Sequence, residues 1–386
     1  MEYAVLVSGG VDSAVALHSL AADGNHSIRA YYLKIWLEDE LSFLGQCPWE
    51  EDLQYARQVC AAAGVPLEVV PMQEQYYERV VGYTLAELRA GHTPSPDIFC
   101  NQRIKFGAFY DVVGGSADRI ASGHYARVLR DGSHARLATA PDPVKDQTYF
   151  LSQLSQDQVS RAEFPIGNMT KAAVRARAQA LQLSNRDRPD SQGICFLGRI
   201  KYADFVRHYL GERRGPIVDA ESGVTLGEHA GSWFYTIGQR QGLGLGNGPW
   251  YVVGRDIDAN VITVSHAIHV ADRARDHVAT GPMHWIAGAP QAGVDDRRDP
   301  LDGGGAFMTP DGSIGGLTAK LRHGPQRVPC VIRPEKPGGS FDTLHVRLAE
   351  ADRGVAPGQF VVLYDDNICL GSGMIEVPME LRHAVA

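Results

Sequence analysis

The first apolar run of the chain stands at its very start. Residues 4–7 are apolar and predict a short strand that is buried on both faces. Residues 8–10 follow with two glycines and predict a sharp turn, since glycine adopts backbone angles that other residues avoid. From Ser13 the apolar residues recur at helical spacing, and Gly24 stands where a helix commonly ends. A strand, a glycine-rich turn and a helix N-terminus together predict an anion site, because backbone N–H groups converge there.

Strand and helix patterns then alternate through the first part of the chain. We expect strands over residues 28–33, 67–70 and 119–121, and helices over residues 50–63 and 73–90. This alternation predicts an α/β fold, a parallel sheet that is doubly wound with helices on both faces. Ligands of such sheets bind beyond the carboxyl ends of the strands. Ser8 and Gly123, each just past a strand, should therefore face one crevice.

The last third of the chain carries a different pattern, in which short β-rich runs alternate with turn residues. These runs are residues 250–253, 261–265, 318–322, 328–332, 344–348 and 359–364. They predict a small antiparallel barrel. We therefore expect three domains: residues 1–165, which also contribute the segment 186–200, a connecting domain over residues 166–248, and the C-terminal barrel over residues 249–386.

Composition and charge narrow the range of functions. The 386 residues contain no apolar run long enough to span a membrane. No leader precedes the first strand, which predicts a cytoplasmic protein, or an organellar one if a transit peptide has been removed. The net charge of −8 argues against indiscriminate coating of nucleic acid. Six widely spaced cysteines without a C-x-x-C pair argue against a disulfide framework, a zinc site or an iron–sulfur cluster. Most of them should be buried apolar side chains.

One segment is locally basic within this acidic chain. Residues 170–181 predict a helix with Thr170 as its N-cap. Basic residues are concentrated in and after it: Lys171, Arg175, Arg177, Arg186, Arg188, Lys201, Arg207, Arg213 and Arg214. Such a cluster predicts either a solvated helix face or a footprint for a phosphate backbone. Residues 236–248 then offer G-x-G-x-x-G spacing without a strand-to-helix context, so we interpret them as a connector near the site.

A candidate nucleophile follows a proline-rich approach. Two prolines prevent a helix until after Pro96, and Asp97 is placed to cap the helix that follows. Cys100 would then lie in the first turn, near Arg103 and Lys105. A helix N-terminus and neighbouring cations lower the pKa of a thiol and favour a reactive thiolate. A buried inert cysteine is the alternative, and the local sequence leaves both open.

The hexapeptide Ser8-Gly-Gly-Val-Asp-Ser13 is the most specific motif of the first strand–turn–helix unit. It has no lysine, so it is not the Walker P-loop, and it lacks the dinucleotide-binding fingerprint. An ordinary tight turn between strand and helix is the plain alternative. The hexapeptide resembles the pyrophosphate loop of ATP pyrophosphatases, which split ATP into AMP and pyrophosphate to adenylate an acceptor.

Further motifs follow in order along the chain. They are Ser95-Pro-Asp-Ile-Phe-Cys100-Asn, Ser122-Gly-His-Tyr125, Lys145-Asp-Gln147, Asp190-Ser-Gln-Gly-Ile-Cys-Phe196 and Cys369-Leu-Gly-Ser-Gly373. With the loop, they resemble the tRNA-specific 2-thiouridylases of the MnmA type over almost the whole chain. That family uses ATP to activate C2 of the wobble uridine in certain tRNAs and then replaces its oxygen with sulfur from a persulfide carrier.

The resemblance implies a role for individual residues. Cys100 matches the attacking nucleophile, Cys195 the cysteine that carries the persulfide, and Asp97 an aspartate that handles protons at the target base. The positions that match ATP contacts are Leu6, Val7, Ser8, Gly9, Gly10, Val11, Asp12, Ser13, Leu33 and Gly123. The positions that match tRNA contacts are Ser95, Pro96, Asp97, Lys145, Asp146, Gln147, Arg322 and His323. Ser95, Leu33 and His323 replace the Asn, Met and Tyr that are usual there.

The chemistry explains why such residues are needed. The uracil oxygen is a poor leaving group until it is adenylated, and the pyrophosphate released needs charge neutralisation from Mg²⁺ and loop N–H groups. Sulfur transfer needs one thiol that holds the sulfur and one that resolves the persulfide by exchange. The resemblance thus implies ATP and Mg²⁺ as cofactors, and tRNA and a persulfide-donating protein as partners. We expect no membrane association, no metal-ligand cluster in the chain itself, and a monomer.

Three other functions fit parts of the sequence. Another adenylating enzyme with the same loop, such as an argininosuccinate synthase or an amidotransferase-type synthetase, has no evident use for Cys100 and Cys195. An iron–sulfur tRNA thiolase is disfavoured by the missing C-x-x-C pair. A nucleotide-binding module that docks RNA without catalysis stays open.

Overall fold

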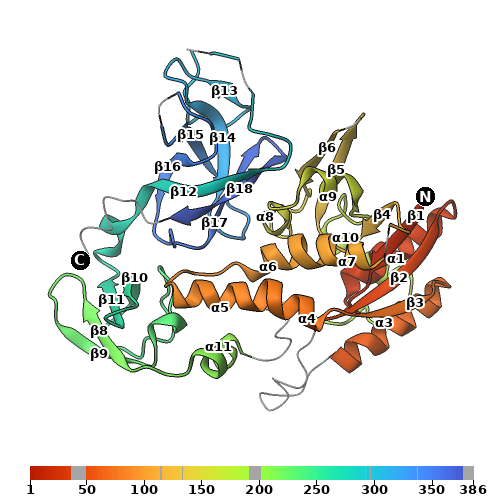
Figure 1. Ribbon diagram of the computed structural model, residues 1–386, viewed down its shortest axis with the longest axis horizontal. Coiled ribbons are helices and arrows are strands. Elements are labelled where there is room, and N and C mark those ends of the chain that lie inside the picture. Colours follow the sequence, from red (N-terminus) through yellow and green to blue (C-terminus); the bar gives the residue numbers. More distant parts are fainter. Residues whose placement is uncertain are drawn as a thin grey trace.

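The computed structural model describes residues 1–35, 49–113, 115–132, 134–190, 201–291, 293–295, 297–336 and 338–376. Figure 1 shows three bodies: an N-terminal body around a parallel sheet at the right, a barrel at the top, and a small sheet at the lower left. We call the last of these the middle body. Among the described residues, no helix is long and apolar enough to cross a membrane.

A parallel sheet forms the centre of the N-terminal body. Its strand order is β3-β2-β1-β4-β7, and all four neighbouring pairs run parallel. The strands are β1 Glu2–Leu6, β2 Ser27–Lys34, β3 Leu67–Pro71, β4 Arg119–Ala121 and β7 Ala162–Glu163. The strands predicted for this part of the chain, and the α/β fold that they imply, are confirmed.

Helices cover both faces of this sheet because the side chains of β1 alternate between them. Tyr3 and Val5 pack in one apolar cluster with three helices: α1 Val11–Asp23, α3 Trp49–Ala63 and α10 Lys171–Ala180. Ala4 and Leu6 pack on the opposite face, against helical residues between 73 and 112. These helices are α4 Gln73–Tyr76, α5 Gly82–Arg89, α6 Pro96–Phe99 and α7 Phe109–Val112, joined by π-helical turns at Tyr77–Val81 and Cys100–Ala108. The doubly wound arrangement is therefore present.

The helix that contains Cys100 begins earlier than its sequence predicts. Pro96 is its first residue and Ser95 holds the N-cap position, so the prediction that Asp97 caps this helix is wrong. Proline fits the first helical position because its missing N–H has no partner to lose there. Cys100 lies beyond the first turn, and its N–H already bonds to the carbonyls of Pro96 and Asp97. The predicted first-turn position of Cys100 is also wrong.

The basic helix α10 belongs to the N-terminal body. Its Val174 and Ala178 lie in the apolar cluster that α1 also joins. Thr170 caps it as predicted, because the Thr170 hydroxyl accepts a hydrogen bond from the Ala173 N–H at 3.2 Å. The prediction that this segment opens the connecting domain is wrong, since α10 buries its apolar side chains against α1.

The middle body is built on a four-stranded sheet of order β10-β11-β8-β9. Its elements are α11 Tyr202–Leu210, β8 Gly215–Asp219, β9 Thr225–His229, β10 Trp250–Asp256 and β11 Val261–His266. Ile217, Val252 and Ile262 close its core together with Leu243 of the glycine-rich connector. The sequence pattern places β10 and β11 in the barrel, and this prediction is wrong because their apolar side chains form a separate core with β8.

The C-terminal barrel closes through six strands in the described part of the chain. Their order is β12-β16-β15-β14-β17-β18, and β18 pairs back with β12. They are β12 Arg275–Trp285, β14 Ile314–Lys320, β15 Val328–Pro334, β16 Leu344–Asp352, β17 Phe360–Asp365 and β18 Ile368–Glu376, with the short β13 Phe307–Met308 beside β14. The predicted barrel is therefore confirmed for its last four runs.

A hairpin of the N-terminal region extends the barrel sheet. It consists of β5 Ala126–Asp131 and β6 His134–Thr139, and β6 pairs with β18 through Ala138 and Ile368. Two short helices follow it, α8 Thr148–Leu151 and α9 Gln156–Arg161. The hairpin joins the barrel to the N-terminal body, a connection that no local sequence pattern indicates.

Candidate active site

The turn after β1 has the geometry that its glycines predict. Gly9 has a φ of +77°, and a Cβ there would lie 2.3 Å from the carbonyl oxygen of Asp52 in α3. Only glycine fits this position. The Ser13 hydroxyl accepts a hydrogen bond from the Ser8 N–H at 3.2 Å and donates to the Gly10 carbonyl at 3.0 Å. The Ser13 side chain therefore holds the loop closed at the start of α1.

Gly123 lies directly against this loop. It follows β4, the neighbour of β1, and a Cβ on Gly123 would lie 2.6 Å from the backbone nitrogen of Ser13. The ends of β1 and β4 therefore lie side by side, whereas a shared crevice stays a prediction. Leu33 lies on β2, the neighbour of β1 on the other side. Three further positions of the predicted ATP set have buried side chains: Leu6, Val7 and Val11.

A network of ion pairs surrounds Asp12, the acidic residue of the loop. The Lys171 Nζ lies 2.8 Å from Asp12 Oδ1 and 2.7 Å from Asp190 Oδ1. Lys145 Nζ lies 2.6 Å from Asp190 Oδ2, and the Arg175 guanidinium lies 2.5 Å from Asp190 Oδ1. Three cations thus face these two carboxylates. A third carboxylate, Asp142, accepts hydrogen bonds from the backbone N–H groups of Lys145 and Lys171, so the group carries no excess charge.

The Asp190 carboxylate keeps its negative charge. Burial would raise the pKa of Asp190, but hydrogen bonds from Lys145 and Lys171 outweigh it and hold the pKa well below its usual value. The Tyr125 hydroxyl donates to Asp12 Oδ1 at 2.8 Å, and burial together with the Asp12 charge raises the pKa of Tyr125. Lys171, Tyr125 and Asp190 were not predicted to lie at the loop. A sequence feature that could have indicated a role for Lys171 is its position directly after the helix N-cap Thr170.

Residues 185–190 lie against the loop. Asn185 Nδ2 donates to the Gly9 carbonyl at 2.8 Å, and Arg188 Nη1 donates to the same oxygen at 3.1 Å. Arg175 donates to the carbonyl of Arg188 at 2.6 Å. Of the basic cluster, Arg175 and Arg188 therefore face inward, while Arg177 is exposed. Cys195 follows this segment and lies outside the described residues.

Cys100 is buried, with 1% of its surface exposed, in the apolar cluster that also contains Ala4 and Leu6 of β1. Asp97 lies one turn earlier on the same helix, so the two side chains share a face. Arg103, expected near the thiol, donates to the Arg79 carbonyl at 2.8 Å and lies 3.9 Å from the centre of the Phe99 ring. The Arg103 guanidinium therefore contacts the Arg79 carbonyl and the Phe99 ring.

Three other described cysteines are structural. Cys60, Cys330 and Cys369 are buried free thiols. Burial raises the pKa of Cys60 to about 11 and that of Cys330 to about 12, so both stay protonated at neutral pH. This agrees with the expectation that most cysteines are buried apolar side chains. Cys47 lies outside the described residues.

The segment 145–147 links the N-terminal body to the barrel. Asp146 Oδ2 lies 2.8 Å from the Nζ of Lys320 in β14, and these side chains are 2% and 1% exposed. Asp146 also accepts hydrogen bonds from the Ala140 N–H at 3.2 Å and the Thr148 hydroxyl at 3.0 Å. Both oxygens of the Asp146 carboxylate therefore bind groups inside the protein. A direct tRNA contact through the Asp146 side chain does not fit this burial.

Other residues of the predicted tRNA set come together at the junction of the two bodies. The rings of Phe150 and His323 stack with centroids 4.7 Å apart, and burial lowers the pKa of His323. Arg322 pairs with Asp352. Gln147 accepts a hydrogen bond from the Tyr125 N–H at 2.9 Å. The turn at 145–147 therefore lies next to the barrel residues that were expected to contact tRNA.

Ser95 and Pro96 lie beside a small, mostly apolar cavity. It has a volume of about 230 Å³ and lies between the N-terminal and middle bodies. Its walls include Thr93, Pro94, Pro96, Tyr202, Trp233 and Thr236. Among the described residues, no cluster of three or more His, Cys, Asp or Glu side chains is arranged to hold a metal ion. A magnesium ion that arrives with ATP phosphates needs only one or two protein carboxylates, and Asp12 is suited to that role.

Comparison with known proteins assigns the family. Family models match residues 1–199 (tRNA methyl transferase HUP domain), 203–266 (tRNA methyl transferase PRC-barrel domain) and 275–375 (aminomethyltransferase beta-barrel domain). The chain is 42% identical over 378 residues to the tRNA-specific 2-thiouridylase MnmA of Porphyromonas gingivalis. It is 41% identical over 377 residues to the protein of the same name from Parabacteroides distasonis. Each alignment covers 97% of this chain and 99% of the relative.

Similarity to solved structures is weaker. The U34-tRNA thiolase NcsA from Methanococcus maripaludis is 17% identical, with a TM-score of 0.33 over 50% of this chain and 60% of that chain, a level that carries no argument. The full-length relatives decide the assignment. This chain belongs to the family of tRNA-specific 2-thiouridylases.

Proposed function

We propose that this protein uses ATP to convert the wobble uridine of tRNA into 2-thiouridine. The observation that carries the proposal is the 42% identity to a curated 2-thiouridylase over 97% of the chain. The loop at Ser8–Ser13 and the Lys171 ammonium group beside it support the use of ATP. The predicted tRNA positions at the edge of the barrel support a tRNA substrate.

In the first step, O2 of the uracil attacks the α-phosphorus of ATP, a phosphorus–oxygen bond breaks, and pyrophosphate leaves. Backbone N–H groups of the loop and Lys171 stabilise the negative charge on the leaving group. Lys171 supplies the cation that the loop itself lacks. Magnesium bound with ATP would add neutralising charge next to Asp12. The product is a uridine whose C2 oxygen carries AMP and can now leave.

In the second step, the terminal sulfur of a persulfide on Cys195 attacks C2, and AMP leaves. The thiolate of Cys100 then attacks the Cys195 sulfur, which breaks the sulfur–sulfur bond and releases 2-thiouridine. A disulfide between Cys100 and Cys195 results, and an external thiol must reduce it. Asp97 lies on the same helix face as Cys100 and handles the proton at the base. Since Cys100 is 1% exposed, this step requires that tRNA binding opens the region around it.

We further propose that a separate persulfide-bearing protein loads Cys195 and that the enzyme acts as a cytoplasmic monomer. We place the domain boundaries between Asp190 and Tyr202 and between His266 and Arg275. The packing of α10 on α1 and the pairing of β10 and β11 with β8 support these boundaries.

The test is transfer of radiolabelled sulfur followed by nucleoside analysis of the tRNA. Cys195→Ser should accept no sulfur, whereas Cys100→Ser should accept sulfur and form no thiouridine. Cys60→Ser, a buried cysteine of the same body, is the control and should keep its turnover per folded molecule. Normal thiouridine formation by either of the first two variants contradicts the mechanism. Methylated uridine in place of thiouridine would favour the activity named in the family models.

A further inference from the structure

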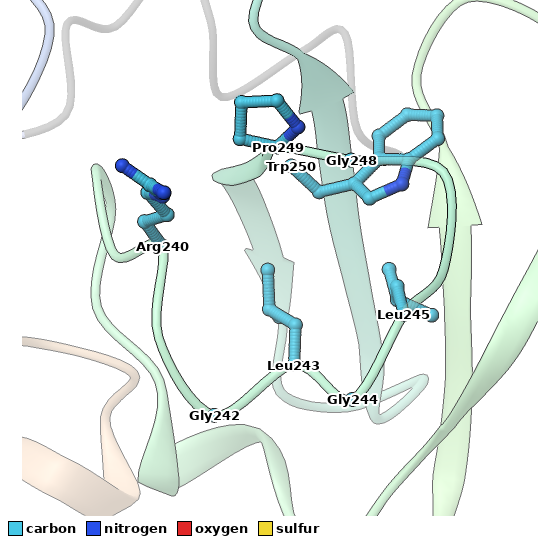
Figure 2. Close-up of a pocket in the computed structure, with 8 residues that line it drawn as sticks. All are labelled: Arg240, Gly242, Leu243, Gly244, Leu245, Gly248, Pro249 and Trp250. Atoms are coloured by element: carbon cyan, nitrogen blue, oxygen red, sulfur yellow. The ribbon is translucent and has the colours of Figure 1, made fainter.

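The glycine-rich connector forms a second cavity, on the middle body. It has a volume of about 310 Å³. Its lining residues are Arg240, Gly242, Leu243, Gly244, Leu245, Gly248, Pro249 and Trp250. Figure 2 shows Arg240 on one side and Trp250 with Leu245 on the other, with Leu243 between them. The cavity therefore combines a cation, an apolar floor and an aromatic ring.

The ring of Trp250 is held in a fixed orientation. Its Nε1 donates to the Gly246 carbonyl at 2.9 Å, so the indole N–H is already satisfied. The ring of His266 meets it edge to face, with centroids 5.2 Å apart and an interplanar angle of 87°. Trp250 remains partly exposed. What it offers a ligand is the face of its ring, which suits stacking with a planar group.

Arg240 supplies the only charge among the residues that line this cavity. Its side chain is exposed, and no carboxylate in the described part of the chain pairs with it. No acidic side chain lines the cavity. The guanidinium is therefore available to a phosphate, which it can bind with two parallel hydrogen bonds.

The connector is attached to the segment that leads to Ser95. Thr93 Oγ1 donates to Thr236 Oγ1 at 3.3 Å. The partly buried Arg255 of β10 donates to the Gly91 carbonyl at 2.6 Å. Since Trp250 begins the same strand, the aromatic wall of the cavity has a fixed position relative to the predicted base-contacting segment.

From these contacts we infer that this cavity binds an unpaired nucleotide of the tRNA close to the target uridine. The base stacks on Trp250 and the phosphate pairs with Arg240. Unpaired bases are commonly recognised by aromatic stacking, whereas paired bases are not accessible to it. This inference rests on the proposed function, which supplies the RNA strand. It assigns a partner to a loop that the proposed chemistry does not use.

The test measures binding of a fluorescein-labelled anticodon stem–loop RNA to the full-length protein, with a fully paired hairpin of equal length as reference. Trp250→Ala should raise the Kd for the stem–loop on the order of tenfold and leave the Kd for the hairpin unchanged. Trp250→Phe should retain most of the affinity. Arg240→Gln should reduce the salt slope of stem–loop binding by about 0.7, the share of one phosphate on a single strand. Arg273→Gln, an exposed arginine that pairs with Glu221 outside the cavity, is the matched control.

Indole fluorescence gives a second readout that does not depend on the alanine variant folding. Stem–loop RNA should quench the wild-type protein and quench Trp250→Phe less. Equal quenching, or an unchanged Kd for Trp250→Ala, overturns the inference. Quenching by free AMP alone of the wild-type protein, but not of Trp250→Phe, would assign the cavity to a free nucleotide and also overturn it.

Thiouridine formation by the wild type is measured in parallel. If the wild type forms thiouridine and Trp250→Ala binds normally, the inference fails and the proposed function stands. If the wild type forms none and Trp250→Ala still weakens stem–loop binding, the proposed function fails and the cavity assignment stands.

Discussion

Replacing Lys320 with methionine should strongly destabilise the junction between the N-terminal body and the barrel. The Lys320 Nζ lies 2.8 Å from Asp146 Oδ2, and both side chains are at most 2% exposed. At an effective dielectric constant of about 20, two unit charges at this distance attract by about 6 kcal/mol, and desolvation offsets much of this gain. Removing the cation alone leaves a buried carboxylate without its counter-charge. We expect the free energy of unfolding to fall by about 3–5 kcal/mol.

Urea denaturation followed by circular dichroism measures this loss. The double variant Lys320→Met with Asp146→Asn should recover much of it, because an amide oxygen can still accept the hydrogen bonds from Ala140 and Thr148. Arg333→Met breaks an exposed pair of the same barrel, whose side chains are 61% and 52% exposed, and should cost at most about 1 kcal/mol. A loss below about 1 kcal/mol for Lys320→Met alone would refute the reasoning from burial.

Three further predictions concern the active-site region. Lys171→Met should slow pyrophosphate release by about 10²–10³-fold, because it removes the cation that pairs with Asp12 of the loop, and an unchanged rate would exclude Lys171 from the first step. Arg175→Ala should lower the free energy of unfolding by about 1–3 kcal/mol, because it removes hydrogen bonds to residues 186–190. Arg177 is exposed, so Arg177→Ala should change the free energy of unfolding by less than about 0.5 kcal/mol and should instead flatten the salt dependence of tRNA binding. Equal effects of the two variants would contradict the inward placement of Arg175. Burial lowers the pKa of His124, so the unfolded chain takes up a proton below about pH 6.5 that the folded chain excludes, and stability should fall from pH 7.5 to 5.5. In His124→Gln this fall should be smaller, and an equal fall would sink the assignment to His124.

The sequence by itself determined the local elements and the loop. Short apolar-rich runs between turn signals marked four of the five parallel strands, because a strand buried on both faces admits few polar side chains. The two glycines after the first strand marked the turn, since the positive φ of Gly9 is a conformation that glycine adopts easily. Thr170 marked the start of α10 through its cap. Each of these features depends on residues that are neighbours in the chain.

Only the tertiary structure decided which elements share a core and which charges meet. The sequence pattern predicted β10 and β11 as strands of the barrel, yet they pack in the core of the middle body. The reason is that segments distant in the sequence determine what an apolar face packs against. Asp146 was predicted as a tRNA contact. Its carboxylate is instead buried and paired with Lys320 of the barrel, which lies 174 positions away in the sequence. Lys171 and Arg175 read as surface charge, and they turn inward because Asp12 and Asp190 lie opposite them in the fold. Residue spacing in the sequence does not predict such contacts, since they form only when separate apolar surfaces have packed together.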